Sequence, residues 1–295
     1  MLIRKRNIGV FHMSIAYYNG EFCEYSELKI PLTDRSIFFG DGIYEACIGH
    51  SGGVYLFDRH IDRLFSNAKK LSIPLSFNRK ELFSVIRSLI VKNGFREYFI
   101  YLQLTRFAPD RIHAYPDTEK SNLLITLKEH RLPSPDTALS LISEEDIRYG
   151  MCDVKTLNLL PAVIASKKAE GLGCGEAVFI RDGYVTECAH SNISVIKDGT
   201  LYTRPLDRYI LPGITRARLL FMCERLGIPT KEIPFTYLDM LSADEVIISS
   251  TTKLILRSNS LDKFDIGGKN IPLFLKLYDS LHTDFREGVQ YGIDF

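Results

Sequence analysis

The chain has 295 residues, a length that suggests about two domains, and 45% of them are hydrophobic, as is ordinary for a globular protein. Lysine and arginine total 37 against 36 aspartates and glutamates, so the charge gives no sign of a nucleic-acid or membrane surface. No apolar run is long enough to span a bilayer, and the basic start MLIRKRNIGVFHMS has too short an apolar stretch for a signal peptide.

The first half of the chain predicts a mixture of strands and helices. SIAYYNGEF is expected to form a hairpin that turns at Asn19 and Gly20. DRHIDRLFSNAKKLSI and RKELFSVIRSLIVKNG carry apolar residues at helical spacing, and the second ends at a glycine. REYFIYLQLTR and SNLLITLK are rich in branched and aromatic residues, which favours strands.

The second half begins after EHRLPSPDTA, whose prolines indicate a linker. A helix is expected after Pro161, then hairpins around RDG and KDG, the helix ITRARLLFMCERLGI and the strand DEVIISSTT. We therefore predict an α+β fold with two domains, 1–131 and 137–295, joined by the linker 132–136. A site between the domains is the default expectation.

The cysteines are scattered and contain no C-x-x-C pair. Such spacing is typical of reduced thiols in a cytoplasmic protein and does not indicate a disulfide framework or a zinc site. We therefore expect a cytoplasmic location and no metal. The six residues are Cys23, Cys47, Cys152, Cys174, Cys188 and Cys223.

Lys155 is the one lysine of MCDVKTLNLL, a run that is otherwise mostly apolar, small or amide. A lysine on a half-buried strand often packs its stem and keeps its ammonium in water. Burial can also lower the pKa of a lysine and make it a nucleophilic amine. Both interpretations remain open from this stretch alone.

Several short motifs could bind an anion. LPGIT leads into a helix whose first N–H groups, at Ile214 and Thr215, lack partners within the helix. The hydroxyl cluster 249–252 and Arg63, in DRHIDRL, could add donors. Taken singly, these motifs are more often an ordinary helix cap, a turn or a surface ion pair.

Two further features could bind other charged groups. Glu187, at the end of a hairpin strand, could hold a protonated heteroaromatic nitrogen or could be solvated. Arg111 and His113 are two residues apart, so in an extended segment they project to one side and could hold a carboxylate. An amine, phosphate donors and an acid together are what a pyridoxal phosphate enzyme needs.

The order of six motifs resembles that of the class IV aminotransferases, which are fold-type IV pyridoxal phosphate enzymes. The resemblance covers most of the chain, from about Tyr18 to Thr252. It rests on FFGDGIYE, HIDRL, VKTLNLL, VTE followed by SN, LPGITR and SSTT.

The resemblance implies a role for each motif. Lys155 would be the catalytic lysine that forms the Schiff base with pyridoxal 5′-phosphate and moves the substrate's α-proton. Glu187 would keep the pyridine nitrogen protonated, and Leu211 would pack under the ring. The phosphate would be held by the remaining predicted cofactor residues, Arg63, Ile214, Thr215, Ser250 and Thr251.

Within the family, the chain resembles D-amino acid aminotransferases most. They have a tyrosine after the Gly-Asp-Gly turn and an Arg-x-His loop, here Tyr44, Arg111 and His113, which hold the substrate carboxylate. The loop comes from the other subunit, which implies a homodimer. Ping-pong transfer between an amino acid, D-alanine or a relative of it, and a 2-oxo acid is thus expected.

Other activities on the same fold remain open. Branched-chain aminotransferases use an arginine within the strand that here reads YFIYLQLT, where no arginine occurs. Aminodeoxychorismate lyase shares the fold and the lysine, so it is the closer competitor. A cofactor-free binding protein is a more remote alternative.

The chain also departs from the D-amino acid aminotransferase pattern. KLILRSN, at 253–259, replaces the usual Ser-Glu-Ile-x-Pro-Val, so Lys253 or Arg257 could act as a second carboxylate site. His190 stands where a serine is usual. These changes concern side-chain specificity, and they leave the lysine and phosphate positions intact.

Overall fold

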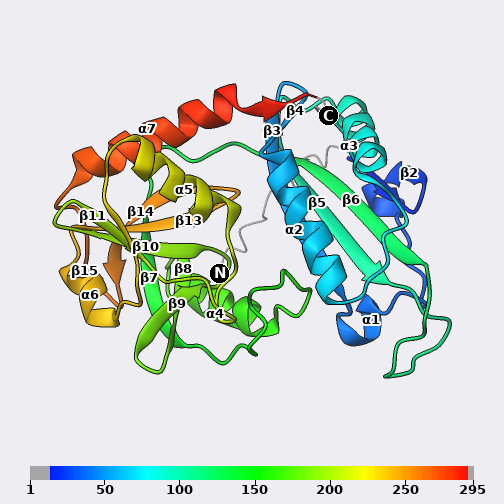
Figure 1. Cartoon of the computed structure of the whole chain (residues 1–295), viewed down its shortest axis with the longest axis horizontal. Coiled ribbons are helices and arrows are strands. Elements are labelled where there is room, and N and C mark those ends of the chain that lie inside the picture. Colours follow the sequence, from blue (N-terminus) through cyan, green and yellow to red (C-terminus); the bar gives the residue numbers. More distant parts are fainter. Residues whose placement is uncertain (1–13, 292–295) are drawn as a thin grey trace, which may run out of the picture.

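The computed structural model describes residues 14–291, which form two β-sheets flanked by helices (Figure 1). The start of the chain, where no signal peptide was predicted, lies outside that range except for its last residue. The first sheet is antiparallel throughout. Its order is β16 (Val289–Gln290), β4 (Gly53–Tyr55), β3 (Gly42–His50), β5 (Glu97–Arg106), β6 (Ser121–Glu129), β1 (Ile15–Tyr18) and β2 (Glu21–Glu24).

The second sheet is mixed, because β7 pairs in parallel with both β14 and β8. A short strand, β15 (Phe264–Asp265), is added to β14. With the helices, this arrangement confirms the predicted α+β class. Its order is β12 (Thr230–Glu232), β11 (Thr200–Thr203), β10 (Asn192–Lys197), β13 (Glu245–Ser250), β14 (Leu254–Leu261), β7 (Ala138–Glu145), β8 (Glu176–Arg181) and β9 (Tyr184–Cys188).

The predicted local elements form at the expected places. The hairpin β1–β2 turns at Asn19 and Gly20, whose φ angles of 47° and 103° are those of a tight hairpin turn. The helix Arg79–Asn93 begins with a capping box formed by Asn78 and Glu81, and it ends at Gly94. The helices are α1 (Ser36–Phe39), α2 (Phe57–Lys70), α3 (Arg79–Asn93), α4 (Leu160–Gly171), α5 (Ile214–Arg225), α6 (Tyr237–Ser242) and α7 (Ile271–Glu287).

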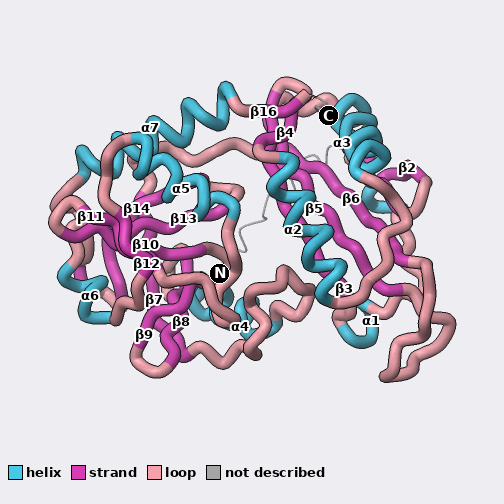
Figure 2. Tube along the Cα trace, in the orientation of Figure 1, coloured by secondary structure: helices cyan, strands magenta, loops and turns pink. Residues whose placement is uncertain are grey.

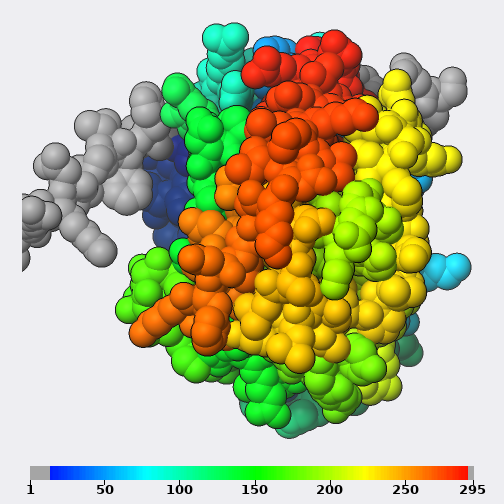
Figure 3. Space-filling model, turned by 90° about the vertical axis from the view of Figure 1, so that its left-hand side faces the viewer, coloured from blue at the N-terminus to red at the C-terminus, as the bar shows by residue number. Residues whose placement is uncertain are grey.

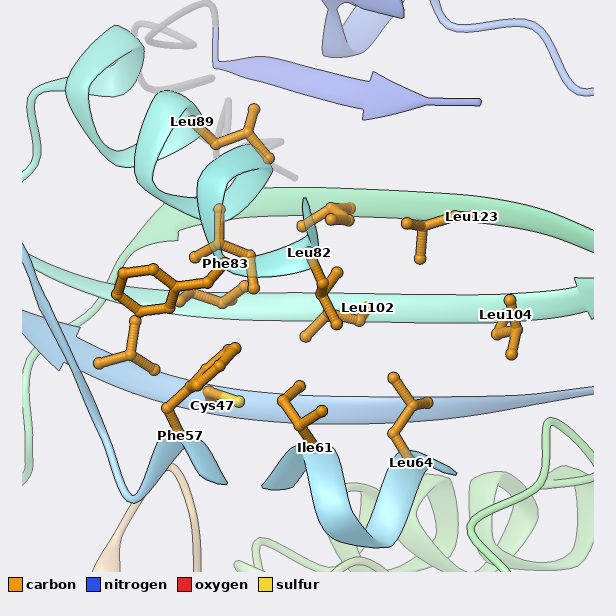
Figure 4. Packing of buried hydrophobic residues seen from close by; sticks show 14 of the residues in the cluster. Cys47, Phe57, Ile61, Leu64, Leu82, Phe83, Leu89, Leu102, Leu104 and Leu123 are labelled. Atoms are coloured by element: carbon orange, nitrogen blue, oxygen red, sulfur yellow. The ribbon is translucent and has the colours of Figure 1, made fainter. Parts of the chain in front are cut away.

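Helices α2 and α3 cover one face of the first sheet. Figure 4 shows Phe57, Ile61 and Leu64 of α2 pointing at the strands, with Leu82 and Phe83 of α3 beside them. These five side chains are buried in one hydrophobic cluster with residues of β3, β5 and β6. Removing such a surface from water is the main source of stability for this half of the chain.

The other face of the first sheet is left for the pocket described below. Side chains alternate along β3, so Ile43, Glu45 and Cys47 face the helices, while Tyr44 and Ala46 face away and line the pocket. Strand pairing therefore decides which polar groups reach the site.

The end of the chain returns to the first sheet. Helix α7 runs from the second sheet across the top of the molecule (Figure 1) and is visible as an orange to red ridge beside α5 (Figure 3). β16 then pairs with β4, and Tyr55 of β4 packs in one cluster with Leu277 and Phe285 of α7. The domain boundaries at 131 and 137 stay a prediction. No helix within residues 14–291 is long and apolar enough to cross a membrane.

Candidate active site

A cavity of about 260 Å³ lies between the two halves of the chain. Its lining residues come from β3, α2 and β5 on one side and from the second sheet and its loops on the other. Figure 2 shows how these elements are arranged along the backbone. Most of the residues that the sequence predicted for a site line this one cavity: Tyr44, Arg63, Lys155, Glu187, Leu211, Ile214, Thr215, Ser250 and Thr251.

Lys155 is held against β3 by backbone pairing. The N–H of Tyr44 donates to the carbonyl of Lys155 at 2.9 Å, and the N–H of Leu157 donates to the carbonyl of Gly42 at 3.1 Å. The loop between β7 and α4 thus adds a short antiparallel bridge at the start of β3. This bridge fixes where the lysine side chain leaves the backbone.

The Lys155 amine has no carboxylate partner among residues 14–291. Its Nζ lies 4.1 Å from the centre of the Tyr44 ring, and the side chain is half-buried. A lysine with only a ring beside it is an amine available to a ligand in the cavity.

Glu187 is buried at the opposite wall, on β9. One carboxylate oxygen accepts from Arg148 Nη1 at 2.5 Å, and the other accepts from Asn192 Nδ2 and the N–H of Leu211, each at 3.0 Å. Burial raises the pKa of Glu187 to about 7, although the positive charge of Arg148 acts in the opposite direction. The carboxyl group can therefore hold or release a proton near neutral pH.

Arg148 is a site residue that the sequence analysis missed. It lines the cavity and is anchored by Asp146, which accepts from its Nε and Nη2 at 2.9 Å each. No motif marks Arg148, because its role depends on Glu187 of β9 contacting the segment that follows β7, two strands away in the sheet. The one local signal is Asp146 two residues earlier, which is too common to be specific.

The N-terminus of α5 opens toward the cavity. Gly213 is its N-cap, and no side chain caps the helix there. A Cβ atom at Gly213 would lie 1.9 Å from Asn192 Oδ1, so only glycine fits. The free N–H groups of the first turn and the positive end of the helix dipole make this an anion site.

Two serine hydroxyls face the same region from the end of β13. Ser249 and Ser250 line the cavity, and both Oγ atoms are buried with no hydrogen-bond partner in the part of the chain that the structure describes. Buried hydroxyls normally find a partner, so these two indicate a polar ligand. Thr251 and Thr252 extend the same wall.

Arg63 joins the two halves of the chain beside the helix N-terminus. It donates two hydrogen bonds to Glu45, at 2.6 and 2.9 Å, and one to the carbonyl of Pro212 at 2.9 Å. Three of the five N–H groups of a guanidinium are thereby used, which leaves two for an anion. Burial alone would raise the pKa of Glu45, but Arg63 and His60 hold it below its usual value.

The structure does not bring Arg111 and His113 into the cavity of their own chain. Both are exposed on the loop between β5 and β6, and neither is among the lining residues. Buried Arg35, which the sequence analysis missed, anchors this loop by donating to the carbonyls of Ile112 and His113. The Arg111 guanidinium lies 5.2 Å from the centre of the Phe39 ring.

The departures from the family pattern differ in position, because Lys253 precedes β14 and Arg257 lies within it. Lys253 contacts His190, which lines the cavity, at 3.0 Å. Arg257 lies farther along β14, with Gly268 as a neighbour, and is not a lining residue. Neither Lys253 nor Arg257 lines the cavity, but Lys253 contacts a residue that does, so Lys253 remains a candidate for the second carboxylate site and the position of Arg257 does not support that role.

The cavity fits pyridoxal 5′-phosphate. An unpaired amine, a buried acid and an uncapped helix N-terminus beside unpartnered hydroxyls are the three groups that the aldehyde, ring nitrogen and phosphate of this cofactor require. Lys155, Glu187 and the first turn of α5 would hold these three parts. The donor set offers no comparable cluster for a metal ion within residues 14–291.

Comparison with known proteins agrees with this chemistry. The model of the family "Amino-transferase class IV" matches residues 42–261. A D-alanine aminotransferase of Listeria monocytogenes is 36% identical over 266 residues, which cover 88% of this chain and 92% of the relative.

Solved structures show the same fold. A putative 4-amino-4-deoxychorismate lyase of Legionella pneumophila has a TM-score of 0.81 at 29% identity, covering 87% of this chain and 96% of its own. The branched-chain amino acid aminotransferase of Escherichia coli has a TM-score of 0.85 at 22% identity, covering 96% of each chain. These structural similarities and the family match confirm the fold-type IV architecture expected from the sequence.

Enzymes of this class use pyridoxal 5′-phosphate to move an amino group between an amino acid and a 2-oxo acid, and the cavity has the groups to hold that cofactor. The extent of the family match and the identity to its curated relatives confirm the resemblance found in the motifs. The chain therefore belongs to the class IV aminotransferases and is a pyridoxal phosphate-dependent enzyme.

Proposed function

We propose that this enzyme transaminates D-amino acids, with D-alanine or a related D-amino acid as donor and a 2-oxo acid as acceptor, by a ping-pong mechanism. The observation that carries the proposal is the unpaired Lys155 amine, which shares one cavity with buried Glu187 and the open end of α5. The identity to D-alanine aminotransferases supports the choice of donor.

Lys155 is assigned as the catalytic residue. Its amine would attach the cofactor, would accept the proton from the substrate's α-carbon as general base, and would later return it as general acid. When bound, the cofactor supplies the electron sink that stabilises the carbanion. Glu187 would hold the ring nitrogen in its protonated state, and the N–H of Leu211 orients the Glu187 carboxylate.

The phosphate is assigned to the first turn of α5 and the wall beside it. Ile214 and Thr215 offer backbone N–H groups there, and Arg63 has two free N–H groups after its bonds to Glu45 and Pro212. Ser250 and Thr251 add hydroxyls from the end of β13.

The substrate carboxylate is assigned to Tyr44 and to Arg111 and His113 of a second copy of the chain. Tyr44 lines the cavity, while Arg111 and His113 are exposed on a loop that lies outside the cavity of its own chain. Arg35 holds that loop in a fixed shape, which suits a loop that reaches into a neighbour.

A homodimer is supported by an apolar surface beside the cavity. Leu160, Val163 and Ile164 of α4 lie at i, i+3 and i+4 and are 69%, 58% and 57% exposed. Phe38 and Ile112, next to the Arg111 loop, are also exposed. Patches of this kind mark interfaces, and a two-fold axis would place each loop over the other copy's cavity.

The assembly can be tested through α4. Val163→Glu puts a charge into the proposed interface and is expected to give monomers with little activity, because each site then loses the partner's loop. Lys167→Gln, on an exposed part of the same helix, is the matched control and should stay dimeric and active. Sedimentation with parallel assays measures both, and a fully active monomer would contradict the proposal.

The D preference can be tested through the loop. Arg111→Ala is expected to lower kcat/KM for D-alanine by about 10- to 100-fold, since one charge-assisted contact is lost, and His113→Ala by less. The holoenzyme should stay yellow, because neither residue contacts the cofactor in this assignment. Faster turnover of L- than of D-amino acids in a substrate panel, or unchanged D-alanine kinetics in Arg111→Ala, would exclude the assignment.

Product analysis separates this activity from its competitors. A lyase would release pyruvate and 4-aminobenzoate from aminodeoxychorismate without a 2-oxo acid. A branched-chain aminotransferase would favour L-leucine, but β5 has no arginine between Tyr98 and Thr105 for its carboxylate. We also propose a cytoplasmic location, for which the scattered, unpaired cysteines are the support.

A further inference from the structure

Three side chains from separate segments meet at the edge of the cavity: Glu176 at the start of β8, His190 between β9 and β10, and Lys253 before β14. Glu176 accepts a hydrogen bond from Lys253 Nζ at 3.2 Å, and its other carboxylate oxygen lies 3.2 Å from His190 Nδ1. Lys253 Nζ also lies 3.0 Å from His190 Nε2. The three groups therefore form a closed triangle.

The carboxylate of this triangle is unreachable, while its imidazole is open. The Glu176 side chain is fully buried and also accepts from the N–H of His190 and from Ser191 Oγ, each at 3.0 Å. The His190 side chain is 50% exposed and lines the cavity. A ligand in the cavity therefore meets the nitrogen side of the triangle.

The protons of the triangle can be assigned from donor and acceptor chemistry. The ammonium of Lys253 only donates, so His190 Nε2 accepts from it, and the proton of a neutral ring is then on Nδ1. Burial lowers the pKa of His190. The negative charge of Glu176 acts to raise this pKa, and the positive charges of Lys253 and Lys155 lower it further. His190 is thus neutral, and Lys253 has one N–H left after its two bonds.

We propose that Lys253, held beside His190, binds the distal carboxylate of a dicarboxylic substrate, namely an acidic amino acid or a 2-oxo diacid. The inference rests on the proposed function, because it assigns a second contact to the substrate of the same cavity. The distal carboxylate of the substrate would accept a hydrogen bond from the free N–H of Lys253 beside His190. The contact would become stronger if the Lys253 ammonium moved away from His190 Nε2 toward the substrate. A substrate with an uncharged side chain would not make this contact.

The position of the triangle suits this role. His190 is three residues after Glu187 and directly precedes Ser191 and Asn192, which also line the cavity. Lys253 directly follows Thr251 and Thr252, which line the cavity at the end of β13, the strand paired with β10. The contact therefore lies next to the cofactor residues, and the Lys155 charge is close enough to act on His190.

The direct test is the variant Lys253→Gln in the holoenzyme. The ratio of KM for 2-oxoglutarate to KM for pyruvate is expected to rise by about 10- to 100-fold, as for the loss of one charge-assisted contact. Lys197→Gln, an exposed lysine of β10 outside the cavity, is the matched control and should keep the ratio. An unchanged ratio in Lys253→Gln overturns the inference.

A second variant guards against misfolding, since Lys253→Gln leaves buried Glu176 without its counter-charge. The double variant Glu176→Gln/Lys253→Gln removes both charges and should show the same rise in the ratio. Calorimetric titration of the holoenzyme with unreactive glutarate and butyrate gives a readout without turnover. Tighter binding of glutarate that is lost in both variants supports the inference, and equal binding of glutarate to all forms overturns it.

The two proposals fail in different ways. A holoenzyme that turns over D-amino acids but binds glutarate no better than butyrate contradicts the distal carboxylate site alone. A holoenzyme that binds glutarate through Lys253 but transaminates no D-amino acid contradicts the proposed function and leaves the binding site supported.

Discussion

Lys155→Ala is expected to abolish transamination almost completely. The variant loses the amine that attaches the cofactor and also the group that moves the α-proton. Proton transfer by a positioned side chain alone is worth roughly 10²- to 10⁴-fold in rate, so the combined loss should exceed that range. Steady-state assays with D-alanine and 2-oxoglutarate measure the effect.

The fold of the variant should survive, because Lys155 Nζ makes no ion pair with residues 14–291 and its backbone bonds to β3 remain. Thermal unfolding should therefore match the parent, and borohydride should no longer fix the cofactor to the protein. Lys167→Ala, which removes an exposed lysine of α4, is the control and should keep full activity. Parent-like turnover by Lys155→Ala without added amines would contradict its assignment as the catalytic residue.

The sequence predicted those parts of the fold that depend on local patterns. The hairpin at Asn19 and Gly20 follows from turn chemistry, and α3 follows from helical spacing, the Asn78 cap and Gly94. The path of α7 and the pairing of β16 with β4 were not predicted, since a two-residue strand has no period to detect. Such pairing depends on which distant segments can bury each other.

The site residues that belong to short sequence motifs could be predicted. Lys155, Glu187 and the LPGIT segment meet in one cavity, as the ordered motifs implied. Arg148 and Arg35 were not predicted, because each acts through groups that are distant in sequence, such as Glu187 and the carbonyl of His113. A lone arginine is ordinary in sequence and becomes informative only when burial gives it partners.

The triangle around His190 is a second example of contacts that the sequence could not predict. The sequence identified His190 and Lys253 as unusual for the family, but it gave no reason to connect them with Glu176, which lies at the start of another strand. The structure joins the three because β8, β9 and β14 belong to one sheet. Two substitutions that look independent in sequence thus form one charge-balanced unit.

Glu187→Gln is expected to lower kcat by roughly 10²- to 10³-fold, the range seen when one charge-stabilising group is removed from an active site. The amide keeps the shape of the side chain but cannot carry the negative charge that holds the ring nitrogen protonated. Cofactor should still bind, because the phosphate contacts at α5 are unchanged. Exposed Glu170→Gln on α4 is the control.

The same variant gives a test that does not depend on turnover. Burial raises the pKa of Glu187 from 4.5 to about 7 in the folded apoprotein. Between these values the folded state binds more protons than the unfolded state, so the free energy of unfolding falls as the pH rises, by about 3 kcal/mol in total. Glu187→Gln should lack this loss and become relatively more stable than the parent above pH 7. If the free energy of unfolding changes with pH in the same way for both proteins from pH 4.5 to 8, Glu187 is not the buried acid. If Glu187→Gln also turns over normally, Glu187 is not the partner of the ring nitrogen.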